Sequence, residues 1–264
     1  MRAFIINLDS ATDRWAFIQA SFAKSQLVLS RVSAIDGAGI RLPDSRFSER
    51  GYQRWHGRSS SNVRELACYL SHLKALKEFL ATDDEHALIG EDDLVLRPGF
   101  DAVLDAALRY ACHWNILRLT ALSPGRPLPL VRLCGDYSLC VSLSRLKGTG
   151  AYVIDRAAAT AFLARLLLMW LPYDHAFDRE WAMGLRAVYI LPFPASQTES
   201  EFLSSVQPGT HPRLSRTRRI LTTYPYQVSN EIMRWLFRSA AFLRFKLLET
   251  GRRPRRWVFK RRGV

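Results

Sequence analysis

The stretch HALIGEDDLVLRPGF, residues 86–100, determines how the rest of the chain is interpreted. An apolar strand, residues 87–89, runs into Glu91, Asp92 and Asp93, and an aliphatic run, residues 94–96, follows. Three adjacent carboxylates repel one another, and Asp is depleted in strands. Their position indicates either a function that needs several carboxylates or a solvated turn.

Apolar strand-like runs and amphipathic helices alternate on both sides of this stretch. The pattern predicts strands at 3–8, 30–35, 87–89, 114–119, 137–143, 150–156 and 186–191, and helices at 15–25, 64–81, 100–110, 157–168 and 173–183. Residues 38–63 and 123–136 are expected to be surface loops. This alternation predicts an α/β fold with a mainly parallel sheet flanked by helices. Ligands of such sheets bind at the carboxyl ends of the strands, which is where the three acids lie.

Composition limits the class of protein. The chain has 264 residues, 48% of them hydrophobic and 11% aromatic, which favours a globular fold over disorder. No apolar run approaches the roughly 20 residues that span a bilayer. The apolar start ends at Asp9 and is shorter than the signal-peptide core of at least about 7 residues. We therefore expect a cytoplasmic protein, whose four cysteines, at no CxxC spacing, are reduced thiols and not a zinc knuckle.

The net charge of +14 is concentrated at one end of the chain. Residues 205–264 hold fifteen Lys and Arg against two acidic residues, whereas the preceding 204 residues are almost neutral. This contrast divides the chain into a first domain, 1–205, and a basic tail, 206–264.

The acidic triplet has a chemical interpretation. Mg²⁺ and Mn²⁺ prefer oxygen ligands, and Mg²⁺ commonly takes one or two carboxylates together with substrate phosphates. A strand that delivers Asp92 and Asp93 to a sheet edge supplies two such ligands. From the triplet alone, a hydrated turn remains the alternative.

Other residues allow a functional and a structural interpretation. Arg14 lies near a predicted helix start, where it either binds a phosphate or ribose or is a surface arginine. Ser71 and His72 lie within a Leu-rich helix, so His72 is a ligand or a hydrogen-bonded structural residue. Asp174 follows Pro172 and is either a helix N-cap or a general base.

Taken together, seven segments occur in an order and spacing that resemble glycosyltransferase family 25. They are FIINLDSATDR, SAIDG, ELACYLSHLKAL, ALIGEDDLVLRPGF, GTGAYVIDRAAATAFL, LPYDHAFD and PFPASQTES. The resemblance covers roughly residues 2–205. The chain departs from the family at Arg64 and Ala67, where glycines are usual, and at Gly90, where an aliphatic residue is usual. Gly90 is expected to loosen the strand end.

The resemblance implies a GT-A-like fold, a nucleotide-sugar donor (commonly UDP-galactose) and an inverting transfer with Mn²⁺ or Mg²⁺. It places the metal motif on Glu91, Asp92 and Asp93, and the late acid, our candidate base, on Asp174. Asp93 is also assigned a catalytic role. The donor-side motifs fall on Asn7, Leu8, Asp9, Asp13, Arg14, Asp36, Gly37, Ser71 and His72. The implied acceptor is a lipooligosaccharide or another surface glycan.

The basic tail contains a predicted amphipathic helix, residues 229–249, with Ser229 as its N-cap and one aliphatic side. A basic, Trp-containing end follows. Together they indicate binding to an anionic membrane surface, here the cytoplasmic face of the inner membrane. The residues assigned to this contact are Arg234, Trp235, Arg238, Arg252, Arg253, Arg255, Arg256 and Trp257. Two alternatives are a helix packed on the domain and, without any recognised motif, a nucleic-acid contact.

Two other functions compete with a glycosyltransferase. A metal-dependent phosphate hydrolase would use the same acids, although it normally has more His ligands than six scattered histidines supply. A membrane-peripheral binding protein without activity would bind no sugar donor.

Overall fold

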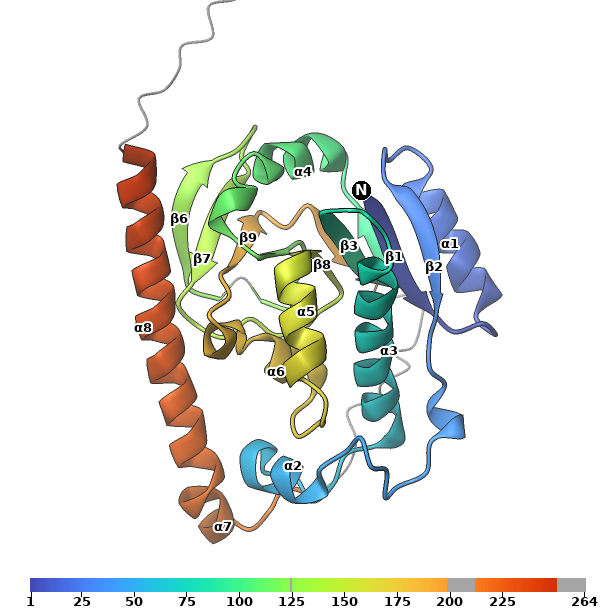
Figure 1. Cartoon of the computed structure of the whole chain (residues 1–264), viewed down its shortest axis with the longest axis vertical. Helices are drawn as coiled ribbons and strands as arrows, with labels where there is room; N and C mark the ends of the chain where they lie inside the picture. Colours follow the sequence, from blue (N-terminus) through green and yellow to red (C-terminus); the bar gives the residue numbers. More distant parts are fainter. Residues whose placement is uncertain (124, 199–211, 251–264) are drawn as a thin grey trace, which may run out of the picture.

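An eight-stranded sheet organises the chain (Figure 1), for which the computed structural model describes residues 1–123, 125–198 and 212–250. In order across the sheet, the strands are β2 (Val28–Ser33), β1 (Arg2–Asn7), β3 (His86–Glu91), β8 (Ala151–Asp155), β5 (Ile116–Arg118), β9 (Ala187–Leu191), β7 (Ser138–Ser142) and β6 (Pro127–Arg132). Strands β8 and β7 run opposite to the other six. The α/β fold with a mainly parallel sheet is confirmed.

Helices cover both faces of this sheet, as the alternation of apolar residues along its strands requires. In β1, Phe4 and Ile6 join the core beneath one set of helices, while Ala3 and Ile5 join the core on the opposite face. The first face carries α3 (Val63–Leu80), α5 (Arg156–Arg165) and α6 (Tyr173–Phe177); the second carries α1 (Thr12–Phe22) and α4 (Phe100–Leu108). Each fully buried Ile or Phe contributes about 1.5–3 kcal/mol.

A second, two-stranded sheet lies next to the acidic triplet. Strand β4 (Leu94–Leu96) pairs antiparallel with β10 (Ala195–Gln197), and Gln197 is opposite Leu94. This pairing brings Gln197 beside the acids although about a hundred residues separate them in the sequence.

The two stretches expected to be loops contain regular structure, so these predictions are wrong. Residues 38–63 include α2 (Glu49–His56) and, together with Gly37, the short helix η1 (Gly37–Gly39). Tyr52 of α2 is fully buried, and its hydroxyl donates to Glu65 at 2.7 Å. Residues 123–136 include β6, whose prolines are tolerated because it is the last strand at the sheet edge.

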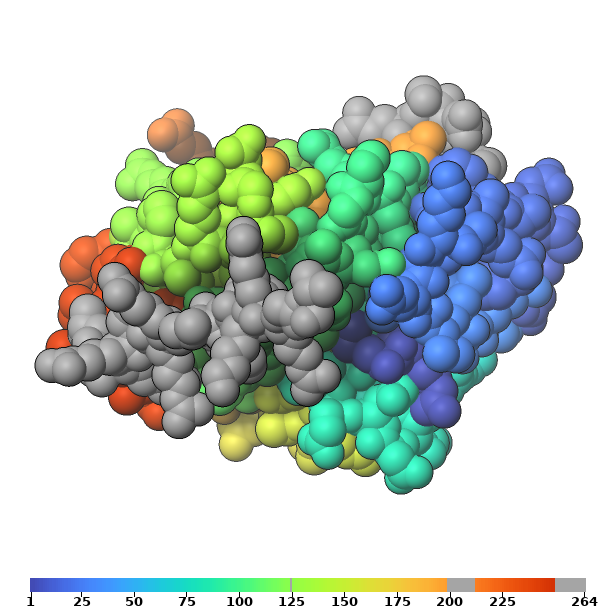
Figure 2. Space-filling view, turned by 90° about the horizontal axis from the view of Figure 1, so that it is seen from above, coloured from blue at the N-terminus to red at the C-terminus, as the bar shows by residue number. Residues whose placement is uncertain are grey.

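The C-terminal part of the described chain is a long helix packed along that edge. Helix α7 (Arg216–Leu221) leads into α8 (Thr223–Thr250), which passes β6 and β7 (Figure 1). Seen from above, α8 lies on the side of the molecule away from α1 and β2 (Figure 2). The helix begins before the predicted N-cap Ser229, because the first turn of a helix tolerates Pro225.

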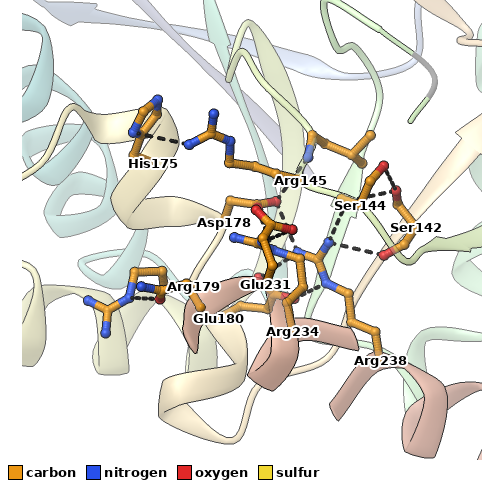
Figure 3. Close-up of polar contacts among 12 residues, drawn as sticks. Ser142, Ser144, Arg145, His175, Asp178, Arg179, Glu180, Glu231, Arg234 and Arg238 are labelled. Carbon is orange, nitrogen blue, oxygen red and sulfur yellow. Dashed lines mark hydrogen bonds and ion pairs between the residues drawn. The ribbon is translucent and has the colours of Figure 1, made fainter. Parts of the chain in front are cut away.

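Two arginines of α8 point into the domain, contrary to their assignment to a membrane surface. Arg234 and Arg238 are 2% and 3% exposed. Arg238 donates to Glu180 of the short helix η3 (Glu180–Met183) at 2.7 and 2.9 Å and to Asp178 at 2.9 Å, while Arg234 Nε lies 2.9 Å from Asp178 (Figure 3). Burial alone would raise the pKa of Asp178, but Arg238, Arg118 and Arg234 hold it below its usual value. The ion pairs therefore fix α8 to the domain.

The aliphatic side of α8 faces outward instead. The residues predicted to share one side are all exposed: Ile232, Leu236, Ala240, Leu243 and Leu247. Trp235 is 53% exposed, whereas Phe245 is buried in the second core. Within the described ranges, no helix is apolar over a length that would cross a bilayer. Arg252, Arg253, Arg255, Arg256 and Trp257 lie outside the described residues.

The remaining short helix, η2 (Ala111–His113), connects α4 to β5. His113 lies beneath α8, with its Nε2 3.0 Å from Glu249 Oε1. The four cysteines are free thiols.

Candidate active site

The carboxyl ends of the parallel strands β1, β2 and β3 lie side by side. They form one edge of the large sheet, which is not the edge formed by the last strand, β6. Asn7 at the end of β1 is paired with Ser33 at the end of β2, and Ile6 is paired with Glu91 at the end of β3. Strand β8 starts at the same edge, because Glu91 donates its backbone N–H to Gly150 at 2.9 Å. The first-strand motif and the acidic triplet are therefore adjacent.

Asp92 links this edge to α1. Its Oδ2 accepts from Asn7 Nδ2 at 2.7 Å, and its Oδ1 accepts from Arg14 Nη1 at 3.0 Å. Asn7 in turn accepts from Arg31 at 2.6 and 2.9 Å. Both oxygens of Asp92, which the sequence predicted as a metal ligand, are thus hydrogen-bonded within the protein. Sequence reasoning missed Arg31, for which a single basic residue in a predicted strand is a weak signal.

The carboxylates of Glu91 and Asp93 share one hydrogen-bond donor, the amide of Gln197. Gln197 Nε2 donates to Asp93 at 3.1 and 3.2 Å and to Glu91 at 3.3 Å. The absence of a side chain at Gly150 makes this possible, because a Cβ there would lie 2.3 Å from Gln197 Cδ. Gln197 lies in one of the seven family-like segments, yet its role as a partner of the acids appears only when β10 pairs with β4.

The electrostatics around these carboxylates favour a cation. Burial, then the neighbouring carboxylates Glu91 and Asp92, raise the pKa of Asp93 to about 6, although its hydrogen bond from Gln197 lowers it. A bound divalent cation would offset this repulsion, and carboxylate oxygens are ligands that Mg²⁺ and Mn²⁺ accept. The residues present therefore fit such an ion, with Glu91 and Asp93 as its ligands.

A second cluster adjoins Glu91 from α3. His72 is buried, stacks on Tyr173 at 4.1 Å between ring centres, and places Nε2 3.5 Å from Glu91 Oε1. Cys68 lies one turn before His72, and ligand atoms of Cys68, His72 and Glu91 all lie within 4.8 Å of one another. Burial, followed by Glu91 and Asp174, raises the pKa of the Cys68 thiol, which keeps it protonated and a poor metal ligand. The i, i+4 spacing from Cys68 to His72 was the only sequence signal for this cluster.

Asp174 lies at the same edge but not as an N-cap, so that structural interpretation is wrong. Pro172 occupies the N-cap position of α6, and Asp174 lies in the first turn. Its Oδ2 accepts the backbone N–H of Gly148 at 3.4 Å, just before β8 begins. Gly148 lies two residues before Gly150, whose backbone oxygen accepts from Glu91, so Asp174 contacts the segment that leads to the acidic triplet.

The remaining residues of the first-strand motif lie farther outward. Asp9 is exposed and accepts from Ser33 at 2.6 Å, while the backbone oxygen of Leu8 accepts from Arg31 at 3.1 Å. Asp13 is exposed in the first turn of α1. Leu8 and Asp9 therefore contact β2 rather than the acidic triplet in the hydrogen bonds described.

Asp36, Gly37 and Ser71 hold the chain after β2 against α3. Asp36 accepts from the backbone N–H of Ala38 at 2.9 Å, and Ser71 Oγ accepts from the backbone N–H of Ile35 at 2.9 Å. A Cβ on Gly37 would lie 3.2 Å from Arg64 Cα, so the family departure at Arg64 is accommodated beside a glycine.

The other family departure, Gly90, does not loosen its strand. Gly90 pairs with Ile5 of β1 and with Ala151 of β8. A Cβ there would lie 2.9 Å from Ile5 Cδ1 and 3.3 Å from Leu94 Cδ2, so neighbouring side chains already fill the space.

The first part of the chain matches a known protein family. Residues 1–124, which include both the first-strand motif and the acidic triplet, match the sequence model of glycosyltransferase family 25 (LPS biosynthesis protein). This match supports both the class, a glycosyltransferase, and the family predicted from the seven segments, glycosyltransferase family 25.

Solved structures resemble the chain only distantly. Protein A197 from STIV has a TM-score of 0.41 and 15% identity over 72% of this chain and 81% of that one. A glycosyltransferase involved in glycosylation of the major capsid of PBCV-1 has a TM-score of 0.37 and 10% identity over the same shares, 72% and 81%. A Drosophila β-1,4-galactosyltransferase 7 in complex with manganese, UDP-Gal and xylobiose has a TM-score of 0.35 and 11% identity over 84% and 74%.

Proposed function

We propose that the chain transfers a hexose, galactose from UDP-galactose, to a hydroxyl of a lipooligosaccharide or another surface glycan with inversion at the anomeric carbon. The observation that carries this proposal is the pairing of Glu91 and Asp93 through Gln197 at the carboxyl ends of the strands, in a chain whose residues 1–124 match a glycosyltransferase family. An inverting transfer needs one group that takes the acceptor proton and another that offsets charge on the leaving diphosphate.

The acids divide between these tasks. Glu91 and Asp93 would hold Mn²⁺ or Mg²⁺, which when bound offsets the charge of the departing nucleotide diphosphate. Asp92 positions Asn7 and Arg14, and Arg14 offers a guanidinium near the donor phosphates. Asp174 accepts the proton of the attacking acceptor hydroxyl as the new glycosidic bond forms and the bond to the diphosphate breaks.

Calorimetry with UDP-galactose, with and without Mn²⁺, tests the donor and the cation. A panel of nucleotide sugars, followed by release of the nucleotide on acceptor addition, identifies the sugar. Asp93→Asn is expected to keep the fold and to abolish transfer. A folded Asp93→Asn protein with full, metal-dependent turnover would refute the assignment, and a protein that binds no nucleotide sugar would favour a non-catalytic role.

We also propose that α8 contacts an anionic membrane surface with its outward aliphatic side. The exposed side chains Ile232, Leu236, Leu243 and Leu247 support this orientation, since the ion pairs of Arg234 and Arg238 fix the opposite side to the domain. Lys and Arg near an anionic surface contribute about 1 kcal/mol each. The enzyme would then act on an acceptor held in the cytoplasmic leaflet.

Flotation with phosphatidylglycerol-containing vesicles tests the membrane contact. The double variant Leu243→Asp/Leu247→Asp should float less than the wild type and should bind UDP-galactose equally well. Equal flotation of both proteins would remove this contact from the proposal.

A further inference from the structure

Two adjoining cavities open beside α6, between α2 and the first turns of α8. Their volumes are about 300 and 380 Å³, and they share Arg145, His175 and Gln227 among their lining residues. We call the two together the acceptor-side groove. Neither cavity includes Glu91 or Asp93 in its lining, so the groove is separate from the proposed cation site.

The larger cavity of this groove is strongly basic. Within the described residues, its lining holds no Asp or Glu. Five cationic side chains line it: Arg58, Arg145, Lys147, Arg213 and Arg219. Burial, then His175, Arg58 and Arg145, lower the pKa of His56 to about 3. The pKa of His175 is also lowered, first by burial and then, against the opposing effect of Asp174, by Arg145 and Lys147. Both histidines are therefore neutral at pH 7, and the cavity still carries a concentrated positive charge.

The smaller cavity has an aromatic wall. Trp55 of α2 and Tyr226 of α8 line it, with ring centres 4.7 Å apart, and Arg179 lies 5.6 Å from the centre of the Tyr226 ring. Flat apolar rings with a polar rim suit the C–H faces and hydroxyl groups of a sugar ring. The groove thus joins an aromatic section to a basic section.

The groove also adjoins the proposed base. His175 follows Asp174 in the chain, and Lys147 precedes Gly148, whose backbone N–H donates to Asp174 at 3.4 Å. Arg145 reaches toward His175, with its Nη1 3.4 Å from Nδ1 (Figure 3). The groove therefore opens beside the segment that carries Asp174, although Asp174 itself is not among the residues that line the two cavities.

From this arrangement we infer that the groove binds the acceptor, and that the acceptor is an anionic saccharide. A sugar ring packs against Trp55 and Tyr226, and a phosphate or carboxylate group on the saccharide binds the cations of the larger cavity. This inference rests on the proposed function, because it assigns the acceptor of the same transfer. Helices α7 and α8 supply Arg219, Tyr224 and Tyr226, so the C-terminal helix completes the acceptor site as well as facing outward.

Binding of three probes to the full chain tests the inference: mannose 6-phosphate, galacturonate and methyl galactoside. The double variant Lys147→Gln/Arg213→Gln changes two exposed side chains and leaves Asp174 in place. Loss of two charge-assisted contacts should weaken binding of an anionic probe about tenfold or more and leave methyl galactoside unchanged. Arg132→Gln, an exposed arginine of β6 outside the groove lining, is the matched control and should bind all probes like the wild type.

The outcomes separate the inference from the proposed function. Tighter binding of mannose 6-phosphate than of galacturonate identifies a phosphate, and the reverse order identifies a carboxylate. Unchanged anionic binding in the double variant, or displacement of mannose 6-phosphate by UDP at a single site, would overturn the inference. UDP-galactose binding with Mn²⁺ is measured in the same samples. If UDP-galactose does not bind while the groove binds anionic sugars, the proposed donor is wrong and the inference about the groove is retained. If UDP-galactose binds and the groove binds no anionic sugar, only the inference about the groove is wrong.

Discussion

Asp93→Asn should make the protein more stable at neutral pH while it abolishes transfer. Asp93 is surrounded by Glu91 and Asp92, and its pKa is raised from 3.8 to about 6, with burial as the largest cause. A carboxyl whose folded pKa lies above its unfolded pKa favours the protonated folded state. The wild type therefore loses stability as the pH rises from about 4 to about 6, and the loss stays constant above that range.

The size of the effect follows from the shift. A difference of about two pKa units at 1.36 kcal/mol each gives about 3 kcal/mol above pH 7, as an upper value because neighbouring acids titrate together. Integration of the linkage relation gives about 1 kcal/mol at pH 4.5. Asparagine has nearly the same shape as aspartate and carries no charge, so Asp93→Asn does not lose stability as the pH rises through this range.

Urea denaturation in the presence of a chelator, at pH 4.5 and pH 7.5, measures the difference. Asp92→Asn is the matched control, because it removes the ion pair with Arg14 and should cost about 1–3 kcal/mol at pH 7.5. The two substitutions at adjacent aspartates should therefore change the free energy of unfolding at pH 7.5 in opposite directions. Addition of Mn²⁺ should then stabilise the wild type and not Asp93→Asn, since a ligand stabilises only the state that binds it. Equal stability of wild type and Asp93→Asn at both pH values would show that the carboxylates do not repel as described.

Three further predictions concern binding and packing. The Mn²⁺ affinity measured by calorimetry should fall as the pH drops below about 6, because protonation of Asp93 removes a ligand. A constant affinity from pH 5 to pH 7 would show that Asp93 is not a ligand of the ion. Gly90→Ala should destabilise the protein by about 1–3 kcal/mol in urea titrations, since its Cβ would lie 2.9 Å from Ile5 Cδ1, and no loss would mean that Ile5 moves freely. Arg238→Met should cost about 3–5 kcal/mol by leaving Glu180 buried without its partner, whereas exposed Arg132→Met should cost almost nothing.

Much of the sheet could be predicted from local patterns. The strands at Phe4, Ile89 and Val153 are short apolar runs that become fully or nearly fully buried, and burial on both faces produces that pattern directly. Strand β6 was missed because its prolines disfavour a strand, and only its place at the sheet edge makes them tolerable. Helix α2 was missed because polar residues surround Tyr52, which is buried by contacts with distant parts of the chain.

The candidate site could also be predicted in part from local sequence patterns. Asn7 and Glu91 each end an apolar strand, and parallel strands bring their carboxyl ends to one edge, so their meeting follows from the pattern. The partners of the acids did not follow, because Gln197 approaches through a separate two-stranded sheet and a glycine gap.

The orientation of the C-terminal helix shows where sequence information ends. Its helical period determined which residues share a side, and Leu236 and Leu243 do share one. Which side faces inward was decided only by the tertiary structure, because Asp178 and Glu180 are buried charges that require partners. Arg234 and Arg238 supply those partners, and an unpaired buried carboxylate would cost more free energy than exposing the leucines. A periodic pattern is local to one helix, whereas the charge that an arginine meets belongs to a distant segment of the chain.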